Sequence, residues 1–108
     1  ASALLPLALN FMELLAGSDY EIEEFQLSHN PLLLKKIQGQ SLAELELGRR
    51  SGAMVLAIRE NGKLIANPGG DTQMAPGQLL IVLGSQTQLA TFKALLGEAV
   101  DTIETMPG

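Results

Sequence analysis

The sequence predicts an α+β fold: a small β-α-β-β-β-α domain with a mixed sheet, preceded by an N-terminal connector helix. Three observations support this prediction, namely an Asn-Gly hairpin signal, two helix-capping boxes, and aliphatic runs of strand length between turn residues. The chain has 108 residues, which is the length of one domain. Because one hairpin and one helical crossover join the strands, we expect a mixed sheet.

The first element is a helix expected over residues 3–16, and it is almost wholly apolar. The residues that follow the three-four spacing of one helical face include Leu4, Leu7, Phe11, Met12 and Leu15. Further leucines fall off this stripe, so the helix must be covered on several sides. A domain of this size can hardly surround it, and we therefore expect those five residues to lie in a dimer interface. We interpret residues 1–18 as a connector cut from a longer chain.

The stretch YEIEEFQLS (20–28) is expected to form the first strand. Its apolar residues Ile22, Phe25 and Leu27 cannot share one face under strict alternation, which predicts a bulge at Glu23 and Glu24. The stretch HNPLLLKKIQGQ (29–40) that follows contains Pro31 and Gly39, and we expect irregular chain there.

Ser41 and Glu44 have the spacing of a capping box, which predicts a short helix to about Arg50 with Gly52 as its end. Strands are expected over 54–60, 63–67 and 78–84. Asn61-Gly62 is expected to join the first two strands in a two-residue hairpin turn. Both positions of such a turn need positive φ, which Asn and Gly adopt readily.

The strand over 78–84 shows little alternation, so both of its faces should be covered. Ser85 and Gln88 form a second capping box, which opens a helix over 86–96. The remaining residues, 98–108, are expected to be a flexible tail.

The composition argues against several functional classes. Seven basic against twelve acidic residues give a formal net charge of -5, and no more than two basic residues adjoin, so we expect no nucleic-acid partner. The chain has no cysteine and a single histidine, His29, which argues against a zinc site. No apolar run reaches the roughly 18 residues that span a bilayer. Since no nucleophile stands beside a base in a recognisable motif, we expect no catalytic residues and no enzyme.

The loop ANPGGDTQMAPG (66–77) has glycines that invite comparison with a phosphate-binding loop. Such loops carry a lysine after the glycines and lead into a helix, whereas here Asp71 follows and a strand comes next. We therefore interpret Gly69-Gly70 as a turn, and Ala75-Pro76-Gly77 as a second turn that leads into the next strand.

Taken in order, the stretch SLAELELGRRSGAMVLAIRENGKLIANPGGDTQMAPGQLLIVLGSQTQLATFKALLG resembles the C-terminal subdomain of the RCK (TrkA-C) family. The resemblance covers about residues 19–97, although the link 29–40 is longer than usual. It implies a cytoplasmic regulatory domain that gates a prokaryotic potassium channel or potassium transporter. The parent protein would then also contain an upstream nucleotide-binding RCK_N subdomain and a membrane pore or carrier, with 1–18 as the connector.

The resemblance also implies a ligand site. In some family members two such subdomains pair and bind cyclic di-AMP between them. Carried over by position, Val55 and Leu56 would form the apolar floor, Arg59 would pair with a phosphate, and Asn61 and Asn67 would donate hydrogen bonds. The same residues also fit a role in the fold alone, as strand core, solvated edge charge and turn positions.

Some RCK channels bind calcium through carboxylates, and the densest acidic run is Asp19, Glu21, Glu23 and Glu24. Its spacing matches no closed calcium loop, so we expect a solvated strand face and no metal site. The leading hypothesis is a ligand-sensing, dimerising regulatory domain. The alternatives are a pure dimerisation module without ligand, or the regulatory domain of a cation/proton antiporter.

Overall fold

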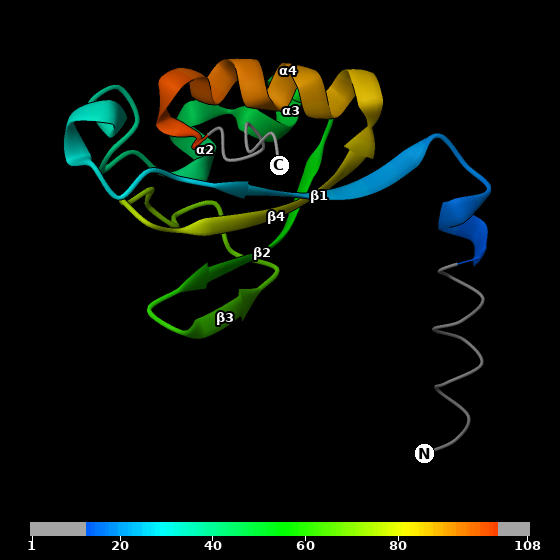
Figure 1. Cartoon of the computed structure of the whole chain (residues 1–108), viewed down its shortest axis with the longest axis horizontal. Coiled ribbons are helices and arrows are strands. Elements are labelled where there is room, and N and C mark those ends of the chain that lie inside the picture. Colours follow the sequence, from blue (N-terminus) through cyan, green and yellow to red (C-terminus); the bar gives the residue numbers. More distant parts are fainter. Residues whose placement is uncertain (1–12, 102–108) are drawn as a thin grey trace, which may run out of the picture.

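The computed structural model describes residues 13–101 and shows one sheet with helices packed on one side of it (Figure 1). Residues 13–16 are helical and precede the sheet. The elements that follow are β1 (Tyr20–Gln26), the 3₁₀ helix η1 (Pro31–Leu34), α2 (Leu42–Leu45), α3 (Leu47–Ser51), β2 (Met54–Glu60), β3 (Lys63–Ala66), β4 (Leu79–Ser85), α4 (Gln86–Leu96) and the 3₁₀ helix η2 (Gly97–Ala99). The α+β class and the predicted order of elements are confirmed, with the first predicted helix of the domain divided in two.

The four strands lie in the order β1-β4-β2-β3, and every neighbouring pair among them is antiparallel. The mixed sheet expected from the sequence is therefore wrong. Strands β1 and β2, which the helical crossover joins, do run in the same direction. They are not hydrogen-bonded to each other, because β4 inserts between them and is antiparallel to both.

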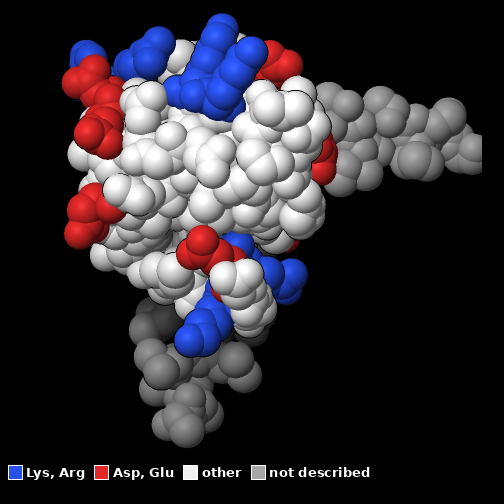
Figure 2. All heavy atoms as spheres, turned by 90° about the vertical axis from the view of Figure 1, so that its left-hand side faces the viewer, with Lys and Arg blue, Asp and Glu red and all other residues white. Residues whose placement is uncertain are grey.

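Charged side chains lie mainly around the rim of the end of the molecule drawn in Figure 2, and its centre is largely uncharged. Basic side chains on this face have acidic neighbours. This pattern differs from the continuous basic stripe that is typical of nucleic-acid-binding domains.

The bulge predicted in β1 is wrong. Strand β1 pairs with β4 without interruption from Tyr20 to Gln26. Ile22 and Phe25 simply point to opposite faces: Phe25 is buried, and Ile22 is 41% exposed. A bulge in β1 would have turned the Ile22 and Phe25 side chains to the same face. None is needed, because Ile22 stays on the outer face.

A bulge does occur in β2, where the register with β4 shifts between Val55 and Ala57. Leu56 is the extra residue. Because of it, Val55 stands opposite Val82 and Ile58 opposite Leu80, so both face the helices although they are three residues apart.

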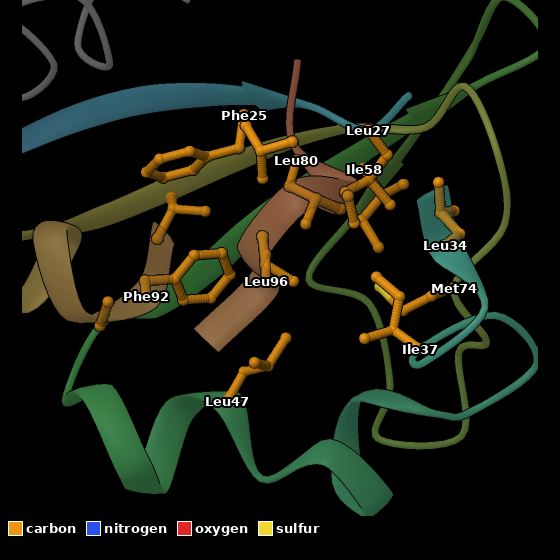
Figure 3. Close-up of a cluster of buried hydrophobic side chains, with 14 of the residues drawn as sticks. Phe25, Leu27, Leu34, Ile37, Leu47, Ile58, Met74, Leu80, Phe92 and Leu96 are labelled. Carbon is orange, nitrogen blue, oxygen red and sulfur yellow. The ribbon is translucent and has the colours of Figure 1, made fainter. Parts of the chain in front are cut away.

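The core lies between the sheet and helices α2, α3 and α4, which share one side of it (Figure 1). Phe25 of β1 and Phe92 of α4 pack with ring centroids 5.3 Å apart at an interplanar angle of 32°. Figure 3 shows side chains from the strands, α3, α4 and η1 converging on this layer. The core members that it labels are Phe25, Leu27, Leu34, Ile37, Leu47, Ile58, Met74, Leu80, Phe92 and Leu96.

Helices α2, α3 and α4 leave the opposite, outer face of the sheet uncovered (Figure 1). Directly paired residues point to the same face, so the register assigns this face in rows across the sheet. We call it the outer face; its apolar members are Tyr20, Ile22, Met54, Ala57, Leu64, Ala66, Leu79, Ile81 and Leu83. The β4 residues of this face are half-buried rather than buried, so the expectation that both faces of that strand are covered holds for the inner face alone.

Both capping boxes form as predicted. Ser41 and Ser85 each accept a hydrogen bond from the backbone N–H three residues on, and the third residue's side chain accepts from the cap in return. The first helix does not run unbroken to Arg50, however. It breaks at Glu46, whose φ of 52° is left-handed, and this separates α2 from α3. Gly52, with φ 84°, ends α3 as expected.

The hairpin signal is confirmed. Asn61 and Gly62 have φ angles of 52° and 78°, which join β2 to β3 through a two-residue turn. The turn at Ala75-Pro76-Gly77 also forms, with Gly77 at φ 82° and a hydrogen bond from Gln78 N–H to the Ala75 carbonyl of 3.4 Å.

Two segments that were expected to be irregular or flexible, 29–40 and the start of the tail, are more ordered than the sequence suggests. Within 29–40, η1 forms and buries Leu34, and Ile37 after its end is buried as well. Residues 98–101 were expected to fray, which is wrong. Val100 is buried and bridges to Leu27, and Asp101 N–H donates to the Gln26 carbonyl at 2.8 Å. The rest of the predicted tail lies outside the described residues.

None of the helices in the described part of the chain is long and apolar enough to cross a membrane. Of the residues predicted to form the dimer interface, Leu15 is half-buried at the end of helix 13–16. The other four lie outside the described residues: Leu4, Leu7, Phe11 and Met12.

Candidate ligand-binding site

A groove of about 550 Å³ runs between the α2–α3 pair on one side and the start of β2 with residues 67–70 on the other. The start of β2 and the residues just after β3 form one wall, and the two short helices form the other. Its apolar members include Leu42, Leu47, Ala53, Val55 and Pro68. We call this feature the groove.

Two of the five predicted ligand residues, Val55 and Asn67, line the groove. Val55 reaches it because the bulge at Leu56 keeps the Val55 side chain on the inner face. Asn67 reaches it because its left-handed backbone, with φ 49°, ends β3 and turns the chain toward the helices. Its N–H donates to the Leu56 carbonyl at 2.8 Å.

The other three predicted residues lie elsewhere. Leu56 is the half-buried extra residue of the bulge, and Asn61 is exposed in the hairpin turn. Arg59 is exposed on the outer face, opposite Leu79 on one side and Leu64 on the other. One copy of the chain therefore does not bring all five residues into one pocket.

The glycine-rich loop closes one end of the groove by hydrogen bonds to the start of α2. Ala43 N–H donates to the Gly70 carbonyl and Leu42 N–H to the Thr72 carbonyl, each at 2.9 Å. Thr72 N–H donates to the Gly69 carbonyl at 3.0 Å, which is the turn expected from the sequence. A Cβ on Gly70 would lie 3.2 Å from the Ala43 Cβ, so the loop can approach the helix closely because residue 70 is glycine.

Two charged side chains of the groove wall were not singled out from the sequence. Arg49 donates a hydrogen bond to the Glu46 carboxylate, one turn earlier, and both side chains line the groove. This hydrogen bond, together with the charge of Arg49, lowers the pKa of Glu46 and raises that of Arg49. The three-residue spacing of Glu46 and Arg49 in ELGR is a sequence signal for such an ion pair. The helix break that turns Glu46 toward the groove has no signal in the sequence.

No cluster of three or more metal-ligating side chains occurs within 13–101. His29 is exposed beside Gly77, and its ring carbon Cδ2 lies 2.8 Å from where a Cβ of residue 77 would stand. The acidic run is exposed along β1, with Glu23 and Glu24 on opposite faces of the strand.

A family model described as the TrkA-C domain matches residues 35–97, which is more than half of the chain. The chain belongs to the TrkA-C domain family. The match contains both capping boxes, the hairpin and the whole groove, and begins after β1. The family resemblance found in the sequence is thereby confirmed.

Solved TrkA-C relatives, in which this domain is called RCK_C, share the fold. The RCK C domain of the potassium transport protein KtrA, solved in complex with cyclic di-AMP, matches with a TM-score of 0.68 and 26% identity over 87% of this chain and 98% of that one. The RCK_C domain dimer of S. agalactiae BusR, also with cyclic di-AMP, matches with a TM-score of 0.60 and 25% identity over 69% and 93%. No curated protein sequence matches the chain.

TrkA-C folds also occur within longer proteins of different kinds. The GsuK channel bound to NAD matches at 24% identity with a TM-score of 0.58, over 72% of this chain and 14% of that one. A BusR structure with promoter DNA matches at 22% identity with a TM-score of 0.63, over 90% and 47%. The expectation of no nucleic-acid partner therefore stays a prediction about this domain's own surface.

Proposed function

We propose that this TrkA-C domain is the ligand-sensing and dimerising regulatory domain of a potassium channel or potassium transporter. Family membership and the likeness to the KtrA domain support this proposal. In the full protein an upstream RCK_N subdomain and a membrane pore or carrier would accompany it, and the domain would lie on the cytoplasmic side. It acts by binding and carries out no catalysis.

The effector that we propose is cyclic di-AMP. The observation that carries this choice is the match to the KtrA domain in complex with that ligand, because it covers 98% of the KtrA chain. The groove offers what such a ligand needs: apolar side chains for flat bases and a few polar groups for orientation.

A site between two copies of the chain accounts for the division of the predicted ligand residues. Val55 and Asn67 of one copy would contact the ligand from the groove. Leu56, Arg59 and Asn61, which lie away from it on the hairpin, would reach the ligand from the second copy. The guanidinium of Arg59 would pair with a phosphate across the interface.

The second copy would cover the outer face. Large apolar side chains on this face are exposed, among them Met54 at 60% and Leu64 at 62%. Leu14, Leu15, Tyr20 and Leu83 surround an apolar hollow where helix 13–16 meets the sheet. The described end of the predicted interface helix, residues 13–16, thus adjoins the outer face. A partner that covers the outer face would then also contact these residues.

Ligand binding would regulate the parent protein by differential affinity for two arrangements of the dimer. A ligand that contacts both copies favours the arrangement in which both sets of contacts form. That change would pass to the pore or carrier through the upstream region.

Calorimetry on the domain tests this proposal, with light scattering to establish the dimer. Cyclic di-AMP should give saturable heat, and cyclic di-GMP at the same concentrations should bind more weakly. Arg59→Gln should weaken cyclic di-AMP binding by about 10- to 100-fold, the loss expected for a charge-assisted hydrogen bond. Lys63→Gln, on the facing strand of the same hairpin, is the matched control and should leave affinity unchanged. A confirmed dimer without heat at millimolar cyclic di-AMP rejects this effector.

The second candidate is a dimerisation module without a ligand, which the exposed apolar outer face favours. A dimer that binds no nucleotide is its expected signature. The alternative for the parent protein is a cation/proton antiporter, with this chain as its regulatory domain. The membrane segments of the full-length protein would distinguish an antiporter from a channel.

A further inference from the structure

Glu46 has a backbone conformation that its residue type rarely adopts. Within the described chain, three non-glycine residues have positive φ, and the other two are Asn61 and Asn67. Asparagine tolerates the left-handed region, whereas glutamate gains nothing from it locally. The conformation breaks the helix and places the Glu46 carboxylate on the groove wall, where Arg49 donates to it.

Among the described residues that line the groove, Arg49 is the one cation and Glu46 the one anion. Their side chains are 71% and 49% exposed, so solvent screens the pair and it contributes little to stability. Arg49 can therefore exchange partners at small cost. A guanidinium binds phosphate oxygens with the same two-pronged geometry that it uses for a carboxylate.

We propose that Arg49 binds a phosphate group of the ligand in the groove, and that Glu46 is the internal competitor which the phosphate displaces. The inference rests on the proposed function, since it names a binding residue and a selectivity device of the same site. In the free domain the Glu46 carboxylate satisfies Arg49 and repels anions from the groove. In the complex the phosphate takes its place, and the Glu46 side chain turns toward solvent.

The device would set a threshold for the ligand. A single weakly held anion does not displace a carboxylate that is tethered three residues away, at the residue that precedes α3. A ligand whose bases also contact the apolar wall at Leu47 and Val55 gains enough additional affinity to do so. The groove would therefore discriminate phosphorylated nucleotides from free phosphate.

Four variants test the inference by calorimetry with cyclic di-AMP, and with ATP as a second phosphorylated nucleotide. Arg49→Gln should weaken binding by about tenfold or more, and Arg49→Lys should retain part of the affinity. Glu46→Gln should tighten binding by about two- to fivefold, since it removes an exposed competitor. Arg50→Gln is the matched control: it removes the same charge from the next residue, outside the groove lining, and should change affinity less than twofold.

The outcomes separate this inference from the proposed function. If cyclic di-AMP binds wild type and Arg49→Gln equally, Arg49 is not a ligand residue, although the proposed function stands. If ATP binds in an Arg49-dependent manner and cyclic di-AMP gives no heat, the inference stands and the proposed effector falls. If neither nucleotide binds a folded dimer, both are overturned. Circular dichroism on each variant checks that the fold is intact.

Discussion

Single residues with positive φ determine where this chain changes direction. Gly77 has φ 82° in the turn that leads into β4, and a Cβ there would approach the His29 ring to 2.8 Å. Gly52 ends α3 at φ 84°, and a Cβ there would meet the Gln88 amide at 2.8 Å. Both positions therefore combine a conformation that favours glycine with a close neighbour.

Replacement of Gly77 by alanine should lower the free energy of unfolding by about 1–2 kcal/mol, because alanine resists the left-handed region. Urea denaturation measures the change. Gly48→Ala is the matched control, since residue 48 lies within α3 with the nearest atom, the Ala53 carbonyl oxygen, 3.5 Å from its Cβ position. That variant should be neutral or more stable by about 0.5–1 kcal/mol. Equal losses in both variants would contradict this account of Gly77.

The sequence predicts positive φ well where the residue type itself favours it. Asn61-Gly62 and Gly52 were identified for this reason, and both behave as expected. Glu46 was not, because SLAELELGRRS reads as one unbroken helix. Its left-handed φ has no signal in the residue type or in the local pattern of the sequence.

The elements begin where side chains satisfy free backbone groups. The long helix α4 opens at Ser85, whose hydroxyl accepts from Gln88 N–H at 3.2 Å while the Gln88 side chain accepts from Ser85 N–H at 2.9 Å. This box lies directly after β4, one of the two inner strands of the sheet, so α4 begins where that strand ends.

Ser85→Ala should cost about 1 kcal/mol of stability, the usual effect of losing an N-cap. Thermal or urea unfolding followed by circular dichroism gives the value. Thr87→Ala, two residues into the same helix and exposed, serves as the comparison and should shift stability by only a few tenths of a kcal/mol. A loss in Thr87→Ala as large as that in Ser85→Ala would argue against the capping role.

Element boundaries were largely predictable because caps and turns are local. Strand order was not. The β2–β3 hairpin is visible in the sequence because its partners adjoin, whereas Phe25 of β1 pairs with Leu80 of β4 far along the chain. Nothing local indicates that β4 inserts between β1 and β2, and the mixed sheet was expected for that reason.

At the scale of the whole molecule, the main feature is a sheet covered on one face. The excess of apolar residues in the sequence predicted a second copy of the chain. The outer face carries several of the large apolar side chains that the described residues leave exposed, namely Tyr20, Ile22, Met54 and Leu64. Of the predicted ligand residues, the groove gathers Val55 and Asn67 and leaves the hairpin residues outside. The sequence could not give this division, because it follows from the bulge at Leu56.

If the outer face is the dimer interface, Leu64→Lys should convert the domain to a monomer at micromolar concentration. A charge placed there would be buried without a partner, which is unfavourable. Leu32→Lys is the matched control, since Leu32 is also exposed, at 74% against 62% for Leu64, but lies on η1. Sedimentation equilibrium should find a dimer for that variant. A dimer in both variants would place the interface elsewhere.

The central claim is that the groove receives a cyclic dinucleotide, and NMR titration with cyclic di-AMP tests it most directly. Amide signals should shift most at groove positions such as Gly48, Gly52, Val55 and Asn67, with a second set at Arg59 on the hairpin. Signals of η1 and η2, whose residues do not line the groove, should change little. Shifts confined to η1 and η2, or none at saturating ligand, would contradict the account.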